Sequence, residues 1–288
     1  DSNVFENPEI FEMEIEAVND AVKLRYLTGE ELSKEVLGVS KIILCGLQKT
    51  NYPVSYSEQN TILQDYMKLL YKEEYNPEKR VYPSNFIGPS SKTLQIRNVV
   101  AITDNSNVPN IRKDFCVTDK ADGDRHLLYV NNVGRIYLIN TNMEVIFTGA
   151  KTEEQQCFNS LIDGELILHD KLSQFINTFA SFDIYYIRGE DVRALGFMPT
   201  ERNEDYTKFR LPLLKQFVNS LKPIGIVNSK KSSPITIETK KFYPFYNTQE
   251  AKAANAKPDM NIFDACNYIL SNIRDGLYKY TTDGLIFT

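Results

Sequence analysis

From about residue 95 onward, short apolar runs alternate with polar turn residues. The runs are rich in Val, Ile, Leu, Phe and Tyr, and Gly, Asn, Asp and Pro separate them, which is the pattern of β-strands joined by turns. We expect strands at 115–119, 125–131, 134–140, 143–148, 162–168, 179–187, 235–239 and 284–287. Many strands in antiparallel order with a few helices indicate an α+β fold.

Three other segments carry apolar residues at helical spacing. In the segment 61–74 the stripe consists of Ile62, Tyr66, Leu69 and Leu70. The segment 204–221 contains Pro212, which either kinks the helix or marks its true start. In the segment 261–273 one face carries Ile262, Cys266, Ile269, Leu270 and Ile273.

The N-terminal part follows a different pattern. Residues 11–17 alternate charged and apolar side chains, which predicts a strand with Glu12, Glu14 and Glu16 on one face. These glutamates could be the solvent-exposed face of an edge strand. Residues 75–95 are rich in Pro, Asn, Ser and Gly and predict a connection. We therefore expect two domains, residues 1–75 and residues 76–288.

The composition is that of an ordinary soluble globular protein. Hydrophobic residues make up 42% and charged residues 25%, with 33 basic and 38 acidic side chains and a net charge of -5. An acidic balance argues against holding duplex nucleic acid by charge alone. No apolar run approaches the length that spans a bilayer, so we expect no membrane partner. The four cysteines are far apart and there are only two histidines, which excludes a usual zinc site and favours reduced thiols.

Lys120 stands at the end of a predicted strand, before the Asp122-Gly123 step, and Arg125 opens the next strand. A lysine held in this way can present its amine to a cleft. The amine is a nucleophile only when deprotonated, so neighbouring cations, a metal or desolvation must lower its ordinary pKa of about 10.4. A hairpin turn with solvated flanking charges explains the same residues.

Three further segments place an acid in or beside an apolar strand. Glu165 follows Asp163-Gly164, Asp183 follows Phe182, and Asp283 opens the last strand. Glu165 could be a metal or ribose ligand, and Phe182 could stack on a base. The structural alternatives are a hairpin turn with Glu165 exposed, and core packing for Phe182.

The order and spacing of these segments resemble the covalent nucleotidyltransferase superfamily, which comprises mRNA capping guanylyltransferases and ATP-dependent ligases. Four matches carry the resemblance: Lys120-Ala121-Asp122-Gly123 with Arg125 to the KxDGxR nucleophile motif, Asp163-Gly164-Glu165 to the acidic third motif, Phe182-Asp183 to the aromatic-acid motif, and Asp283-Gly284-Leu285-Ile286-Phe287 to the fourth motif.

The amino-acid sequences of two segments are closer to capping enzymes than to ligases. Ligases usually have Glu-Gly where this chain has Asp283-Gly284, and the segment 86–90 with Leu94 resembles the short element that precedes the nucleophile in capping enzymes. The expected fold is therefore the ligase/capping-type nucleotidyltransferase fold of antiparallel sheets with flanking helices. The chain most resembles the multifunctional capping enzymes of large DNA viruses.

The resemblance also has consequences for the parent protein. Glu12, Glu14 and Glu16 resemble the last metal-binding strand of tunnel-type RNA triphosphatases, so residues 1–75 are expected to be the tail of such a domain. A downstream methyltransferase would fit the same kind of parent chain, and the expected location is cytoplasmic, in a viral factory or virion. The chain stops after the fourth motif, so we expect the guanylyltransferase domain to be truncated, without the fifth and sixth motifs or the OB-fold domain. A further family arginine has no clear counterpart, because residues 140–142 occupy its place.

The activity implied by the resemblance has two steps. Lys120 forms a lysine–GMP intermediate from GTP with release of pyrophosphate, and GMP then passes to the 5′-diphosphate end of an RNA. A divalent cation, Mg²⁺ or Mn²⁺, is implied as cofactor. Glu165 and Asp283 are expected to bind the metal. Arg125 is expected to bind the ribose and to lower the pKa of Lys120, and Phe182 to stack on the guanine. Asp183 is expected to position Lys120 or metal-bound water, and Lys240 or Lys241 to bind the triphosphate.

Two alternatives to this activity stay open from the sequence. An ATP-dependent polynucleotide ligase adenylyltransferase shares the lysine chemistry but takes ATP. An inactive nucleotidyltransferase fold could instead serve as an interaction module.

Overall fold

The computed structural model describes residues 13–16, 28–102, 108–199, 205–227, 232–244 and 260–288. The chain divides into two units, Asp1–Pro53 and Val54–Thr288. The assignment of residues 1–75 to a triphosphatase tail stays a prediction. Among the described residues, no helix combines the length and the apolar character that a membrane span requires.

The first unit contains the helix α1, Gly29–Leu47, which the sequence analysis did not predict. It begins with a capping box in which Thr28 and Glu31 satisfy each other's backbone N–H groups. The strand expected at 11–17 is wrong for residues 13–16, which form no regular secondary structure. Alternation alone does not make a strand, because its backbone N–H and C=O groups need a partner strand. Glu14 and Glu16 are exposed, and Glu12 lies outside the described residues.

The second unit is built on an eight-stranded sheet in its described part. The strand order is β7-β6-β5-β2-β3-β4-β8, with β9 also pairing with β6. All neighbours along this path are antiparallel, whereas β9 runs parallel to β6. The strands are β2 (Asp124–Val130), β3 (Arg135–Asn140), β4 (Val145–Lys151), β5 (Ser160–His169), β6 (Phe175–Ile187), β7 (Glu190–Asp191), β8 (Ile224–Gly225) and β9 (Thr236–Thr239).

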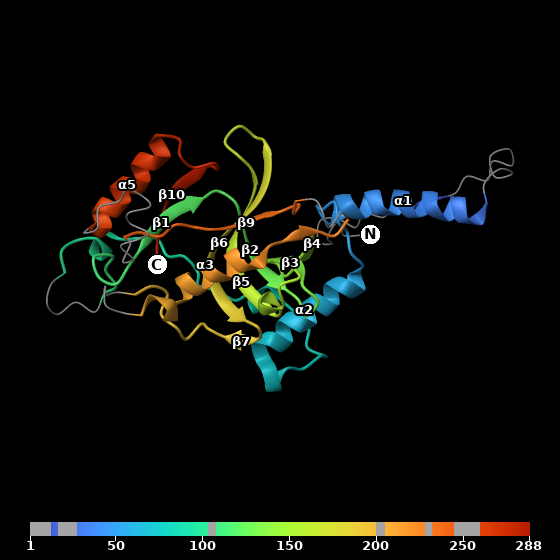
Figure 1. Ribbon diagram of the computed structural model, residues 1–288, viewed down its shortest axis with the longest axis horizontal. Helices are drawn as coiled ribbons and strands as arrows, with labels where there is room; N and C mark the ends of the chain where they lie inside the picture. Colours follow the sequence, from blue (N-terminus) through green and yellow to red (C-terminus); the bar gives the residue numbers. More distant parts are fainter. Residues whose placement is uncertain (1–12, 17–27, 103–107, 200–204, 228–231, 245–259) are drawn as a thin grey trace, which may run out of the picture. The chain divides into compact units, whose positions relative to one another are not determined.

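A separate two-stranded sheet joins β1, Val117–Ala121, to β10, Thr282–Phe287. The helix α5, Ile262–Arg274, packs on this pair through Ala265 and Ile269, beside the buried Val117 (Figure 1). Leu270 was expected on the buried face but is 43% exposed. The strands expected from residue 115 onward are confirmed, with shifted ends, and in the described part of the chain only the two-residue strands β7 and β8 were not predicted.

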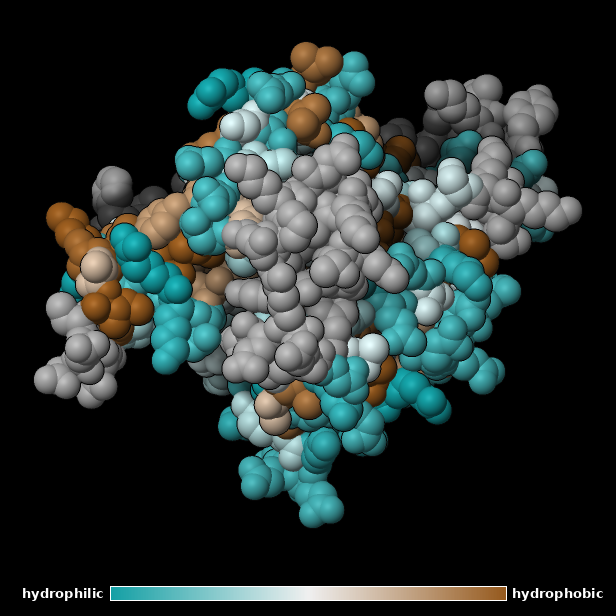
Figure 2. Space-filling view, turned by 60° about the vertical axis from the view of Figure 1, so that its left-hand side comes forward, coloured by the Kyte–Doolittle hydropathy of each residue, from teal (hydrophilic) through white to brown (hydrophobic). Residues whose placement is uncertain are grey.

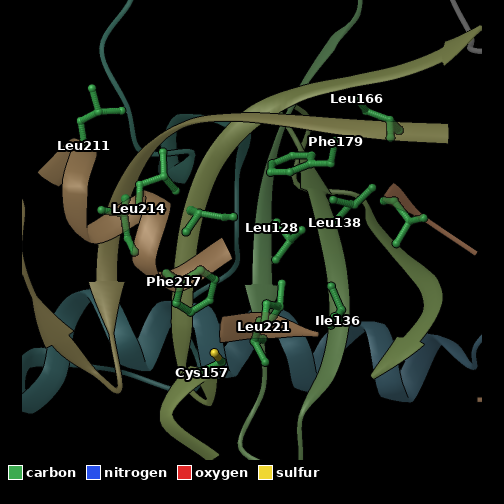
Figure 3. Close-up of a cluster of buried hydrophobic side chains, with 14 of the residues drawn as sticks. Leu128, Ile136, Leu138, Cys157, Leu166, Phe179, Leu211, Leu214, Phe217 and Leu221 are labelled. Atoms are coloured by element: carbon green, nitrogen blue, oxygen red, sulfur yellow. The ribbon is translucent and has the colours of Figure 1, made fainter. Parts of the chain in front are cut away.

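The helix α3, Arg210–Leu221, covers one face of the large sheet. Pro212 lies in its first turn, which confirms the second of the two expectations for this residue. The helix turns apolar side chains toward those of β2, β3 and β6 (Figure 3), and each buried leucine contributes about 1.5–3 kcal/mol. The residues in this contact include Leu211, Leu214, Phe217, Leu221, Leu128, Leu138 and Phe179.

The helix α2, Tyr56–Tyr71, lies against the other face of this sheet. Tyr137 alternates along β3 with Leu138, which faces α3, and its hydroxyl donates to Glu58 of α2 at 2.7 Å. Arg135 forms an ion pair with the same carboxylate at 2.7 Å. On the face shown in Figure 2, the visible described residues are largely hydrophilic, and hydrophobic ones form separate groups.

Candidate active site

Lys120 lies on β1 and Arg125 on β2, so the nucleophile motif links two different sheets. The Asp122-Gly123 step is therefore a crossing between sheets and not a hairpin turn. Gly123 is required there because β5 passes close to it. A Cβ at this position would lie 2.7 Å from the carbonyl oxygen of Leu166 and 2.9 Å from Cγ of Glu165.

Lys120 and Asp283 meet across the β1–β10 pair, where Lys120 lies opposite Gly284. The Lys120 Nζ and Asp283 Oδ2 atoms are 2.5 Å apart, and each side chain is about half exposed, at 46% and 50%. The hydrogen bond that Lys120 donates to Asp283 raises the pKa of Lys120, and the charge of Glu165 also raises it. The expectation of a lowered lysine pKa is thus wrong for this ligand-free arrangement, because the groups that dominate around the amine are carboxylates.

Glu165 lies on β5 directly opposite Arg125 of β2. Burial raises the pKa of this carboxyl to about 7, although the nearby charge of Lys240 lowers it. The hairpin-turn alternative is wrong, because Asp163, Gly164 and Glu165 are all inside β5. Gly164 allows the Phe179 ring to pack against the strand, since a Cβ there would lie 2.5 Å from that ring.

Arg125 is held by the fully buried Asp163. Its Nε donates to Oδ1 at 3.1 Å and its Nη2 to Oδ2 at 2.6 Å, and the Tyr185 hydroxyl donates to the same Oδ2 at 2.5 Å. Sequence reasoning placed Asp163 in a motif but missed its role and that of Tyr185. An acid in the middle of an apolar strand was the available signal for Asp163, and Tyr185 gave none.

Lys240 is buried beside Lys120's own strand. Its ammonium donates to the backbone carbonyl of Asp119 and lies 3.3 Å from Asp119 Oδ2. The Tyr280 hydroxyl donates to the same oxygen at 3.1 Å. Burial lowers the pKa of Lys240, against the effect of Asp119. Lys241 is exposed, and its carbonyl accepts a hydrogen bond from Thr118. Phosphate binding by either lysine stays a prediction.

Asp183 has a different partner from the one expected. Arg210 at the start of α3 donates to its two carboxylate oxygens at 2.8 and 3.1 Å. The contact ties α3 to β6, so the carboxylate holds Arg210 and not Lys120. The preceding Phe182 is partly buried, packs against the main core, and lies 5.7 Å from the Arg125 guanidinium.

Glu165 and Asp283 are the expected metal ligands of this domain. The described part of the chain contains no group of three or more His, Cys, Asp or Glu side chains that could hold a metal ion. Asp283 nevertheless pairs with the Lys120 ammonium, and the charge of Glu165 raises the pKa of the same amine. Two carboxylates with water as the remaining ligands fit the way Mg²⁺ is usually bound.

Comparison with known proteins decides the family. The model of the mRNA capping enzyme catalytic domain matches residues 100–265, which is more than half of the chain. The chain belongs to the family of mRNA capping enzyme catalytic domains. The expected resemblance is thereby confirmed, and so is the ligase/capping-type fold. The matched range includes Lys120, Arg125, Glu165 and Asp183, and it ends before Asp283.

A curated relative and two solved structures resemble this capping-family chain. The "Probable mRNA-capping enzyme" of Acanthamoeba polyphaga mimivirus is 32% identical over 189 residues, which cover 65% of this chain and 13% of that protein. A mycobacterial DNA ligase D complexed with ATP and MES is 14% identical, with a TM-score of 0.33 over 60% of this chain and 48% of that one. The ligase domain of LigD from M. tuberculosis is 13% identical, with the same TM-score and the same coverage.

Proposed function

We propose that this chain is an mRNA guanylyltransferase in which Lys120 carries GMP between GTP and the 5′-diphosphate end of an RNA. One observation carries the proposal: the amine of Lys120 meets Asp283, a residue 163 positions further along the chain, while Glu165 acts on the same amine from a third strand. Family membership supports the same activity. Three strands thus bring a potential nucleophile and two acids together.

The proposed covalent step is a nucleophilic displacement at phosphorus. Lys120 first gives up a proton to solvent water, and the nitrogen lone pair then attacks the α-phosphorus of GTP. The bond from that phosphorus to the bridging oxygen breaks, and its electrons leave with pyrophosphate. In the second step an oxygen of the RNA 5′-diphosphate attacks the same phosphorus, and the P–N bond breaks to return the amine.

The resting amine is protonated, because its ion pair with Asp283 raises its pKa. Reaction therefore requires Asp283 to exchange its partner before or during GTP binding. A divalent cation, Mg²⁺ or Mn²⁺, bound by Glu165 and Asp283 would neutralise phosphate charge and compete with the ammonium for Asp283. A calorimetric Mg²⁺ titration tests this fit: the wild-type chain should bind the cation, and Glu165→Gln should lose that binding while remaining folded. Equal binding by the variant would contradict the ligand assignment.

Arg125 is proposed to bind the nucleotide, most simply at the ribose, because it is held rigidly by Asp163 beside Glu165. Phe182 is proposed to stack on the guanine, since it lies next to the Arg125 guanidinium at the edge of the core. A base stacked on an aromatic side chain gains about 1–3 kcal/mol. Lys240 or Lys241 is proposed to contact the phosphates.

The test is incubation with α-labelled GTP or ATP and a divalent cation, followed by denaturation. GTP label that survives denaturation and is absent in Lys120→Ala supports the proposal. Label from ATP alone would instead indicate an adenylyltransferase. No label from either nucleotide, including in a longer chain of the parent protein, would indicate an inactive interaction module.

A further inference from the structure

The loop 85–89 lies directly against the guanidinium of Arg125. The Pro89 carbonyl accepts a hydrogen bond from Arg125 Nη1 at 2.8 Å, and the Phe86 ring lies 5.5 Å from the guanidinium carbon. Gly88 has a φ of +132°, and a Cβ there would lie 2.2 Å from Arg125 Nη2. The backbone of this loop therefore limits where the guanidinium can lie.

Gly88 also touches the residues that hold Arg125 from the other side. The same Cβ would lie 3.0 Å from Asp163 Oδ2 and 3.0 Å from the Tyr185 hydroxyl. The guanidinium thus lies between the Asp163 carboxylate on β5 and the loop 85–89. This loop precedes residues 100–265, which match the family model. Moving the loop must change the surroundings of Arg125.

The backbone at the start of the loop is held by the fully buried Tyr66 of α2, and the Asn85 side chain also donates to the Tyr71 hydroxyl of the same helix at 3.3 Å. The Tyr66 hydroxyl donates to the carbonyl of Asn85 at 2.7 Å and accepts from the backbone N–H of Ile87 at 3.1 Å. Burial raises the pKa of Tyr66, so the hydroxyl stays protonated and can donate across the physiological pH range. The Tyr66 hydroxyl thus donates one hydrogen bond and accepts another at the start of the loop.

We propose that Tyr66 is a positioning residue for Arg125, acting through the loop 85–89. The contacts run from Tyr66 to Asn85 and Ile87, and from Gly88 and Pro89 to Arg125. The loop is the part that contacts Arg125, and α2 acts on the proposed nucleotide site only by holding the loop. The proposal depends on the proposed function only for the assumption that Arg125 binds the nucleotide.

The main variant is Tyr66→Phe, which removes both hydrogen bonds and keeps the ring. Tyr137→Phe is the matched control, because its hydroxyl also makes a 2.7 Å hydrogen bond to α2, through Glu58, but does not contact the loop. We expect Tyr66→Phe to raise the KM for GTP in lysine–GMP formation about tenfold, with kcat changed less than about twofold. Tyr137→Phe should leave the KM for GTP unchanged.

A double-mutant cycle separates positioning from general destabilisation. If Tyr66 acts through Arg125, Tyr66→Phe should change the KM by less than about twofold in an Arg125→Ala background. A KM effect of full size in that background, or a wild-type KM in Tyr66→Phe alone, would overturn the proposal. Gly88→Ala, which pushes on Arg125 directly, should reproduce the KM effect and serves if Tyr66→Phe does not fold.

A second readout does not depend on activity. The Nε–H of Arg125 donates to Asp163, so its NMR signal should be resolved and slow to exchange in the wild-type chain and in Tyr137→Phe. Tyr66→Phe should shift or broaden that signal. An unchanged signal would overturn the positioning role whether or not GTP labels the protein, whereas absent labelling with a shifted signal would reject only the proposed function.

Discussion

The partly buried position of Glu165 disfavours the charged form of its carboxyl group. Replacing Glu165 with glutamine measures how much this lowers the stability of the fold. Burial raises its pKa from an ordinary 4.5 to about 7. A carboxyl with a raised pKa binds its proton more tightly in the folded state. Its contribution to stability is fully present below the unfolded pKa, near pH 4.5, and is lost as the pH rises through about 7. Glutamine is uncharged at every pH and does not undergo this loss.

The size of the effect follows from the two pKa values. Each pKa unit corresponds to about 1.4 kcal/mol, so the interval from 4.5 to about 7 gives an upper limit of about 3.5 kcal/mol. Glu165 keeps partial contact with solvent, which screens the charge. We therefore expect Glu165→Gln to be more stable than the wild-type chain by about 1.5 kcal/mol at pH 8.5, and closely similar at pH 5.

Urea unfolding at the two pH values, without nucleotide or divalent cation, measures this difference. Glu153→Gln is the matched control, because the Glu153 side chain is 74% exposed and its replacement should show no such dependence on pH. A Glu165→Gln variant whose advantage is the same at both pH values, or absent at pH 8.5, would refute the reasoning. If Glu165→Gln is more stable but inactive, the carboxylate lowers the folding stability and is required for catalysis.

Three further outcomes follow from the contacts around the site. Asp283→Asn removes the carboxylate that raises the pKa of Lys120, so acetylation of that amine by acetic anhydride at pH 8, followed by peptide mass spectrometry, should be faster; an unchanged rate would argue against the ion pair. Asp163→Asn leaves Arg125 without its buried counter-charge and should cost about 3 kcal/mol in urea unfolding, and a loss below about 1 kcal/mol would show that the pair is not needed. Gly123→Ala forces a Cβ to within 2.7 Å of the Leu166 carbonyl and should cost about 1–3 kcal/mol, so wild-type thermal stability would contradict the close approach of β5.

The strands were predictable because their periodicity is a local property. Alternating or continuous apolar runs identified β2 to β6 within a few residues, and Pro212 correctly marked the start of α3. The same local reasoning failed for residues 13–16, where alternation occurs without a partner strand. It also left a hairpin turn at Asp163-Gly164 open beside the strand 162–168, although this step is buried inside β5.

The candidate site was predictable only in part. Lys120 and Asp283 of two separate motifs form an ion pair, and the charge of Glu165 from a third raises the pKa of the same amine; the roles that the resemblance implies for them stay predictions. Two contacts were not predictable, because they depend on long-range packing that no motif encodes. Asp183 pairs with Arg210 of α3, and Tyr66 of α2 anchors the loop beside Arg125. Arg210 and Tyr66 lie in helices, and the sequence pattern of a helix predicts which face is apolar but not which polar group a side chain will contact.

The most direct test of the account is to locate the covalent bond itself. The protein is incubated with GTP and Mg²⁺ or Mn²⁺, digested, and analysed by peptide mass spectrometry under conditions that preserve the P–N bond. The account predicts one GMP on the peptide that contains Lys120 and none in Lys120→Arg. GMP on a different residue, or an equal yield of adduct in that variant, would contradict it.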